Sequence, residues 1–375
     1  MKPYRQKFGM IAALGALALT LAACGTDDAT GDAAADPTTD PTTDTEAASA
    51  EALSGDLVGA GASSVESAMA AWVAGFQATN PDVTISYDPV GSGGGRTQFA
   101  ESATDFGGTD SALDEEEWAL AEARCEPGEV AELPLYISPI AVAFNLPGID
   151  SLNMSAETIA KIFTGEITSW DAPEIAEANP DVELPALTIT PVNRSDESGT
   201  TKNFTEYLAA ASAGAWPHEA SGDWPVTGTQ SAQGTSGVIQ TAQSAEGAIT
   251  YADASKVGTL GTVAVKVGEE FVPYSPEAAA AVVDESPLAE GRAATSLVRE
   301  LERDTTASGV YPIVLVSYTM ACTQYEDAET GALVKAFLTY VASEEGQAAA
   351  ADAAGSAPIS ADIRTAVMEI VDSIA

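Results

Sequence analysis

The sequence predicts an α/β fold, in which a parallel β-sheet carries helices on its faces. Three observations lead to this prediction. Short apolar strands alternate with amphipathic helices, glycine-rich loops join them, and 375 residues are enough to bury a real core. Hydrophobic residues make up 45% of the chain, so the chain as a whole is not disordered. The length corresponds to about two or three domains.

The chain is strongly acidic. It has 15 Lys and Arg against 56 Asp and Glu, a formal charge of −41. This charge repels nucleic acids and anionic membranes at long range, so we exclude both as partners held by electrostatic attraction. The same repulsion disfavours small anions. At physiological salt, however, charges more than about 8–10 Å apart are largely screened from each other, so short-range contacts can still bind a small anion.

The N-terminus has the pattern of an export signal. A basic start is followed by an apolar stretch over residues 8–23, which is short for a membrane span of roughly 20 residues. The stretch ends in Leu-Ala-Ala-Cys, which resembles a bacterial lipobox. We therefore expect residues 1–23 to be a lipoprotein signal peptide and Cys24 to carry the lipid, palmitate included. The alternative is an ordinary secretory signal with a chance cysteine.

Residues 24–56 have no hydrophobic periodicity and are rich in Asp, Thr, Pro and Ala. Low hydrophobicity and like charge keep such a segment extended. We expect it to be a disordered acidic tether between the anchor and the folded body.

The folded body begins with two strand–helix units. An apolar run opens at Leu57, and residues 65–76 place apolar side chains at helical spacing. Residues 83–87 alternate as a strand does. We expect Gly91–Gly95 to be a loop before a short helix ending near Ala103.

The remaining elements follow from the same patterns. We expect further strands over residues 137–144, 188–192 and 310–316, and helices over residues 156–163, 200–211, 331–350 and 363–374.

Three loops of small residues each open a predicted helix. The N-terminus of a helix presents unbonded N–H groups and a partial positive charge, and small residues let an anion approach them. In α/β sheets such loops lie at the carboxyl ends of strands, where ligands bind. Each loop alone is more often a simple turn. Together they predict an anion site formed by Gly61–Ser64, Gly91–Gly95 and Ser198–Thr200, with Arg194 beside the last.

Two carboxylates stand out from an acidic chain whose other acids we expect on the solvated surface. Asp196 lies next to Arg194 and could hold its guanidinium flat. Asp110 follows a glycine-rich segment and could accept a hydrogen bond from a protonated ligand oxygen.

Enzyme signatures are missing. His218 is the only histidine and lies in a Trp/Gly/Pro-rich loop, and the sequence has no nucleophile elbow, P-loop or complete dinucleotide fingerprint. It has no CxxC or Cys/His cluster either, so we expect no metal and no cofactor. The sequence therefore predicts a protein that is not an enzyme.

Two cysteines remain after Cys24. An even pair in an exported protein favours a disulfide between Cys125 and Cys322. The alternative is two separate buried thiols.

Several motifs, taken in their order and spacing, resemble the Pst-type phosphate-binding proteins, the periplasmic or lipid-anchored substrate-binding lipoproteins of the phosphate ABC transporter. The resemblance runs from about Leu57 to the C-terminus. It is carried by the segments Gly59–Ser63, Gly91–Gly94, Asp105–Asp110, Ile159–Trp170, Arg194–Thr200 and Gly247–Tyr251.

The resemblance implies a two-lobed periplasmic-binding-protein fold of type II, with the ligand cleft between the lobes and two chain crossings. We expect the crossings near residues 137–140 and 311–314. Lobe I would then be discontinuous, formed by residues 57–138 plus 313–375, with residues 139–312 as lobe II. The disulfide would join the two parts of lobe I and constrain the unfolded chain.

The resemblance also implies a role for each site residue. Hydroxyl or backbone N–H donors to phosphate are expected at Ser63, Ser64, Ser92, Ser198, Gly199 and Thr200. Arg194 would give a charge-assisted contact, Asp196 would orient it, and Asp110 would accept the proton of hydrogen phosphate. Ser64 stands where the family often has a bulky residue, and Gly93 stands where a serine is common.

The implied function is high-affinity binding of inorganic phosphate outside the cell membrane and its delivery to an ABC-type phosphate importer. The permease and ATPase subunits of that importer would be the partners, and the lipid at Cys24 would hold the protein on the membrane. One alternative is a receptor or sensor for another tetrahedral oxyanion. A second is a secreted phosphatase on the same scaffold.

Overall fold

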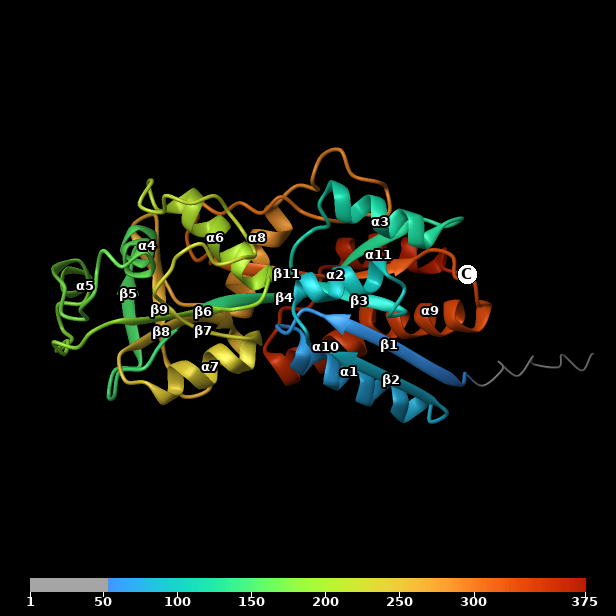
Figure 1. Ribbon diagram of the computed structural model, residues 1–375, viewed down its shortest axis with the longest axis horizontal. Helices are drawn as coiled ribbons and strands as arrows, with labels where there is room; N and C mark the ends of the chain where they lie inside the picture. Colours follow the sequence, from blue (N-terminus) through green and yellow to red (C-terminus); the bar gives the residue numbers. More distant parts are fainter. Residues whose placement is uncertain (1–52) are drawn as a thin grey trace, which may run out of the picture. The chain divides into compact units, whose positions relative to one another are not determined.

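The computed structural model describes residues 53–375 (Figure 1). The predicted signal peptide, Cys24 and most of the tether lie outside the described residues. Strands and helices alternate along the described chain, so the α/β class is confirmed, but the sheet is mixed instead of parallel. Within residues 53–375, no helix is long and apolar enough to cross a membrane.

The first half of the fold is built on the sheet order β2-β1-β3-β11-β4. Strand β1 pairs in parallel with β2 and β3, whereas β11 runs antiparallel to β3 and β4. The strands are β1 (Gly55–Gly61), β2 (Val83–Asp88), β3 (Phe106–Thr109), β4 (Val130–Phe144) and β11 (Val314–Cys322). The helices of this half are α1 (Glu66–Thr79), α2 (Ser92–Ala100), α3 (Glu115–Cys125), α9 (Ala328–Ala342), α10 (Glu344–Ala354) and α11 (Ala361–Asp372).

The second half continues from β4 through β8, β6 and β7, and β9 pairs with β4, β5 and β10. Its further strands are β5 (Ser151–Met154), β6 (Thr190–Arg194), β7 (Gln230–Ala232), β8 (Ala248–Asp253), β9 (Gly261–Val267) and β10 (Glu270–Val272). Its helices are α4 (Ala156–Thr164), α5 (Pro173–Ala178), α6 (Gly199–Ala211), α7 (Gly234–Ser244), α8 (Pro276–Glu285) and the 3-10 turn η1 (Ala254–Lys256).

Strand β4 belongs to both halves. Up to Pro139 it pairs with β11, and from Ile140 onward it pairs with β8. All of its residues are buried. The backbone N–H of Ile140 donates to the carbonyl of Ile313 at 2.7 Å, so both expected crossings lie side by side. Figure 1 shows β4 and β11 passing together between the two halves.

Three predicted elements differ from the structure. The run after Gly91 is the first turn of α2 and not a loop, because α2 packs so closely on β1 that a Cβ on Gly95 would lie 2.4 Å from the Cα of Gly61. This packing outweighs the low helix propensity of glycine. The predicted helix 331–350 breaks at Ser343, whose hydroxyl caps α10. Strand β11 starts at Val314, later than residue 310.

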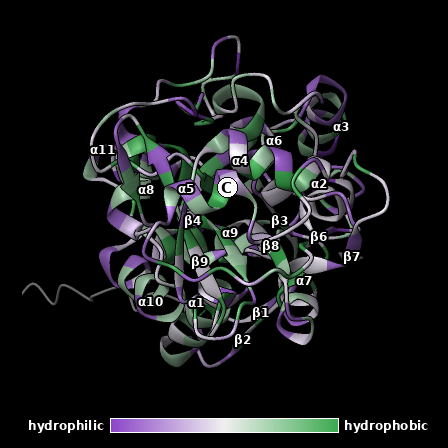
Figure 2. Cartoon of the chain, turned by 90° about the vertical axis from the view of Figure 1, so that its left-hand side faces the viewer, coloured by the Kyte–Doolittle hydropathy of each residue, from purple (hydrophilic) through white to green (hydrophobic). Residues whose placement is uncertain are grey.

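Each half has an apolar interior. Trp72 and Tyr136 pack edge to face in the first half, and Phe204 stacks on Tyr251 in the second. In Figure 2, apolar green lies on central strands such as β8 and β9, and purple lies on many outer loops and helix faces. Hydrophilic residues thus lie mainly on the outside of an apolar core, although three carboxylates, Asp110, Glu132 and Asp253, are buried.

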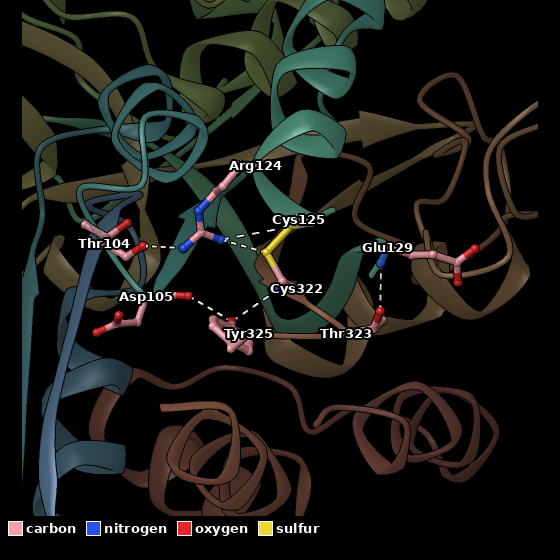
Figure 3. Close-up of a disulfide and its surroundings, with 8 residues drawn as sticks. All are labelled: Thr104, Asp105, Arg124, Cys125, Glu129, Cys322, Thr323 and Tyr325. Carbon is pink, nitrogen blue, oxygen red and sulfur yellow. Dashed lines mark hydrogen bonds between the residues drawn. A yellow bond between two sulfur atoms is a disulfide. The ribbon is translucent and has the colours of Figure 1, made fainter. Parts of the chain in front are cut away.

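The disulfide lies at one end of the first half. The structure joins Cys125, at the end of α3, to Cys322, at the end of β11 (Figure 3). Beside it, the guanidinium of Arg124 lies 4.0 Å from the centre of the Phe99 ring and donates to the carbonyl of Thr104 at 2.7 Å. The bridge therefore fastens the C-terminal part of the chain to the N-terminal part, far along the sequence.

Candidate functional site: a polar cleft between the two halves

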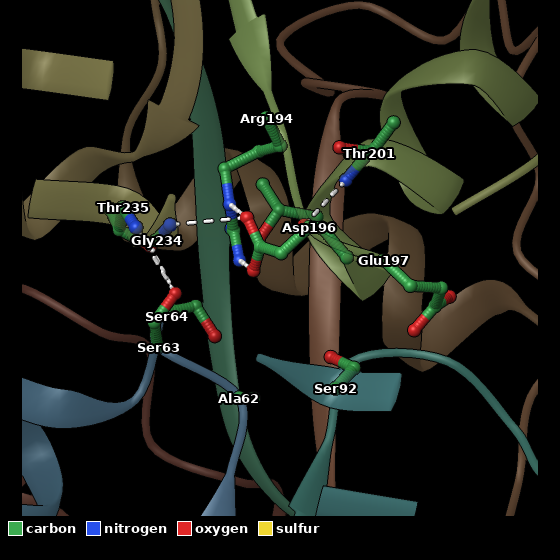
Figure 4. Close-up of polar contacts among 12 residues, drawn as sticks. Ala62, Ser63, Ser64, Ser92, Arg194, Asp196, Glu197, Thr201, Gly234 and Thr235 are labelled. Carbon is green, nitrogen blue, oxygen red and sulfur yellow. Dashed lines mark hydrogen bonds and ion pairs between the residues drawn. The ribbon is translucent and has the colours of Figure 1, made fainter. Parts of the chain in front are cut away.

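The residues predicted for the anion site come together where the two halves face each other. Ser63, Ser64, Ser92 and Asp110 come from the first half, at the end of β1, the start of α2 and the end of β3. Arg194, Asp196 and residues 198–200 come from the second half, at the end of β6 and the start of α6. These are carboxyl ends of strands, where α/β proteins bind ligands. Figure 4 shows Ser63, Ser64 and Ser92 facing Arg194 and Asp196.

Asp110 is almost completely buried, with 3% of its surface exposed. Its carboxylate accepts from the hydroxyl of Ser64 at 2.7 and 2.8 Å, and from the hydroxyl of Thr200 in the other half at 3.0 Å. Burial raises the pKa of Asp110 above its usual value, and the bonds from Ser64 and Thr200 partly oppose that shift. The site thus contains a desolvated acceptor that would favour a ligand carrying a proton.

Arg194 supplies the cationic group. Its Nε and Nη2 donate to Asp196 at 2.8 and 2.5 Å, and the backbone N–H of Gly234 donates to the same carboxylate at 3.1 Å. Burial acts to raise the pKa of Asp196, but bonding to Arg194 outweighs it and the pKa is lowered. Among residues 53–375, Nη1 of Arg194 has no hydrogen-bond partner. Asp196 therefore fixes one edge of the guanidinium and leaves Nη1 for another acceptor.

The start of α6 supplies backbone donors. Ser198 caps the helix by accepting from the N–H of Thr201 at 3.2 Å, so the N–H groups of Gly199 and Thr200 have no partner inside the helix. Gly199 packs directly on the first half. A Cβ there would lie 2.6 Å from both the Cβ of Asp110 and the hydroxyl of Ser92. Only glycine lets the helix end approach the carboxylate this closely.

The hydroxyl of Ser63 bonds to a residue that the sequence analysis did not single out. It lies 3.0 Å from the hydroxyl of Thr235 at the start of α7, and it accepts from the backbone N–H of Thr235 at 3.1 Å. In this structure the Ser63 hydroxyl therefore joins the two halves. Residues 233–237 read Gln-Gly-Thr-Ser-Gly, a fourth run of small residues that opens a helix, so the rule applied to the other loops would have found it.

Two ion pairs also cross between the halves. Arg96 of α2 lies 3.0 Å from Glu197 and 2.7 Å from Glu117, and Lys256 lies 3.0 Å from Glu66. Glu197 packs against Gly93, where a Cβ would lie 2.2 Å from its Oε2. A larger residue at position 93 would displace the Glu197 carboxylate that pairs with Arg96.

His218, the single histidine of the chain, is half-buried and packs edge to face on the buried Trp216 of the second half. Among residues 53–375, no group of three or more His, Cys, Asp or Glu is placed to hold a metal ion. The cleft contains donors, one arginine and one buried carboxylate.

Comparison with known proteins identifies the family. Residues 36–345 match the model of the PBP superfamily domain. The chain is 36% identical over 347 residues to phosphate-binding protein PstS 3 of Mycobacterium tuberculosis, covering 88% of this chain and 90% of the relative. The chain belongs to the PstS family of phosphate-binding proteins.

Solved structures of other phosphate-binding proteins have the same fold as this PstS family member. A high-affinity periplasmic phosphate-binding protein bound with phosphate at pH 8.5 aligns with a TM-score of 0.67 at 20% identity, over 84% of this chain and 93% of that chain. A phosphate-binding protein from Stenotrophomonas maltophilia aligns with a TM-score of 0.64 at 19% identity, over 84% of this chain and 94% of that chain. At this identity the likeness concerns the fold, which is the expected two-lobed fold.

Proposed function

We propose that this protein binds inorganic phosphate in the cleft, outside the cell membrane, and delivers it to an ABC-type phosphate importer. The observation that carries the proposal is that a buried carboxylate, Asp110, and a buried cation, Arg194, both lie among hydroxyl and backbone donors where the two halves meet. Membership in the PstS family supports it.

The proposed ligand contacts follow the geometry. Arg194 donates from Nη1, and the start of α6 donates through the N–H groups of Gly199 and Thr200. In the first half the Ser92 hydroxyl and the backbone N–H groups of Ser63 and Ser64 complete the set, because the Ser64 hydroxyl already donates to Asp110. Asp110 accepts the remaining proton of hydrogen phosphate. Because sulfate is fully ionised, it would face the carboxylate without a proton to share and would be repelled. Asp196 orients Arg194 and does not contact the ligand.

We also propose how the chain is divided into domains. Residues 57–138 plus 313–375 form lobe I and residues 139–312 form lobe II, with both crossings at the point where β4 changes partner. Residues 1–23 are removed, the lipid is attached at Cys24, and the residues that follow tether the body to the membrane. The tether ends before the expected residue 56, because Gly55 and Asp56 pair with β2 as the start of β1. The importer's permease and ATPase subunits are the partners, and the protein carries out no catalysis.

Titration calorimetry tests the binding proposal. The purified protein is freed of bound phosphate by unfolding, dialysis and refolding, and is then titrated with phosphate and with sulfate. We expect tight phosphate binding and sulfate binding weaker by roughly several orders of magnitude, since a site with an unpaired buried group rejects the wrong analogue. Equal affinity for the two anions would contradict the proposal. Absence of turnover on a phosphomonoester separates it from a phosphatase.

A further inference from the structure

The connection between α8 and β11, residues 286–313, bonds to both halves of the fold. We call it the strap; it is the orange segment between these elements in Figure 1. The strap carries Arg292, Arg299 and Arg303, three of the fifteen basic residues of the chain. We expected nearly all of it in lobe II. Its residue Ser296 nevertheless donates at 2.7 Å to Glu132, in the part of β4 that pairs with β11.

One end of the strap holds the loop that follows Asp110. Glu132 is fully buried and accepts from the backbone N–H of Leu113 at 2.8 Å. Arg292 donates from Nη1 to Glu132 and from Nη2 to the carbonyl of Leu113, both at 2.7 Å. Both backbone polar groups of Leu113 are thus engaged by this ion pair, three residues after Asp110.

The other end of the strap reaches Asp110 through Asn203 of α6. The amide of Asn203 donates to the carbonyl of Asp110 at 2.7 Å and to the carbonyl of Gly199 at 2.8 Å, while its oxygen accepts from Nη2 of Arg303. Because a guanidinium can only donate, Arg303 fixes which way the Asn203 amide faces. Arg303 is itself anchored on β11, where Nη1 donates to the carbonyl of Val314 at 2.6 Å.

Packing alone does not hold this side of the site. A cavity of about 400 Å³ lies between the strap and the loop, and its lining includes Asp110, Asn203, Arg292 and Arg303. Where side chains do not fill the space, directed hydrogen bonds decide the position of the backbone.

We propose that Asn203 and Arg303 are positioning residues for anion selection, which hold the backbone of Asp110 so that its carboxylate stays against the start of α6. Arg292 and Glu132 hold the far end of the same loop. The inference rests on the proposed phosphate function and goes beyond it, because none of these four residues belongs to the proposed ligand contacts.

The physical reason is the distance dependence of a hydrogen bond. An O–H···O bond is made at about 2.5–3.0 Å and is lost well before 3.6 Å, so a small shift of Asp110 removes its bond to the ligand proton. The same shift relieves the repulsion of a fully ionised anion. Loss of the Asn203 bonds therefore weakens phosphate binding and strengthens sulfate binding relative to it.

The test measures the ratio of the sulfate and phosphate dissociation constants by calorimetry. We expect Asn203→Ala to lower this ratio by at least about tenfold, since an ångström of misplacement can cost that much or more. The matched control is Asn179→Ala at the end of α5. Asn179 is also buried and makes three bonds, to the N–H and carbonyl of Asn153 and to the carbonyl of Ile175. Both variants lose stability, but only the first changes the ratio.

Further variants test whether the effect on the ratio passes through the Asn203 amide and the Asp110 carboxylate. Arg303→Met is expected to lower the ratio, and adding Asn203→Ala to it adds little, because both changes release the same amide. In an Asp110→Asn background, Asn203→Ala leaves the ratio unchanged. If Asn203→Ala keeps the wild-type ratio while its melting temperature falls, the inference is wrong and the residue is only structural. This outcome decides the matter even where Arg303→Met does not fold. A wild type that binds no phosphate would instead overturn the proposed function.

Discussion

Two arginines, each in its own region, show how the same side chain serves two purposes. Arg194 and Arg303 are both nearly buried, 3% and 6% exposed. The guanidinium of Arg194 bonds through one edge to Asp196, and its Nη1 has no hydrogen-bond partner among residues 53–375. Arg303 uses Nη1 on two carbonyls of the second crossing and Nη2 on Asn203 and Glu206.

This difference shows that burial alone does not identify an anion-binding arginine. What matters is how many donors remain after the protein's own acceptors are served. Around Arg303 the acceptors come from α6 and from the second crossing, and they engage both Nη groups. Around Arg194 a single carboxylate two residues away satisfies one edge. At Arg303 both Nη groups are engaged and only the buried Nε has no partner among residues 53–375, whereas at Arg194 the whole Nη1 group remains for a ligand.

The largest expected effect contrasts the two arginines directly. Arg194→Ala should weaken phosphate binding by about 10²–10³-fold, because truncating one member of a buried charged pair costs roughly 2–5 kcal/mol. Arg303→Met should weaken it by only about tenfold and lower the melting temperature more than Arg194→Ala does. Calorimetry and thermal unfolding of both variants measure this. A loss of affinity as great for Arg303→Met as for Arg194→Ala would remove the distinction.

A second contrast concerns carboxylates with and without a cation. Asp196 is paired with Arg194, whereas Asp253 is buried beside the hydroxyl of Tyr136. Burial raises the pKa of Asp253 to about 6. A carboxyl whose pKa is raised on folding stabilises the native state while protonated, and that stability is lost as the pH rises through about 6.

The loss of stability with rising pH gives a measurable prediction. Between about pH 4 and pH 7, the wild type should lose about 2 kcal/mol of unfolding free energy through Asp253 that Asp253→Asn does not lose. Urea unfolding of both proteins across this range, without phosphate, gives the difference. Other buried acids such as Asp110 contribute equally to both curves and cancel to first order. Parallel curves would mean that Asp253 is not desolvated as the structure shows.

The smallest expected effect tests the ion pair at the cleft edge. Arg96 uses its guanidinium on Glu117, Glu197 and two hydroxyls, so it behaves as Arg303 does. Glu197 is about one-third exposed, and a partly exposed pair contributes roughly 0–1 kcal/mol. We therefore expect Glu197→Ala to change phosphate affinity by at most about fivefold. A loss comparable to that of Arg194→Ala would place Glu197 in the site itself.

The candidate site was predictable wherever its parts lie close together in the sequence. The start of α6, the Arg194–Asp196 pair and the loops after β1 and before α2 each consist of a few consecutive residues whose local geometry follows from their types. The parts that were missed join distant residues. Asn203 and Arg303 are 100 residues apart, and Ser63 and Thr235 are 172 apart. No local pattern marks the Asn203–Arg303 pair, whereas Thr235 does lie in a small-residue run that opens α7, and only its contact with Ser63 has no local signal.

By itself, the sequence determined the alternation of strands and helices, the loops that end in the cleft, and the acidic surface, because periodicity and turn chemistry are local properties. Tertiary structure alone decided that β11 runs antiparallel beside β3 and β4, that the run after Gly91 is helical, and which arginine keeps a donor for the cleft. The physical reason is the same in each case. Strand direction, close packing and the number of acceptors around a guanidinium depend on segments that meet only when the chain folds.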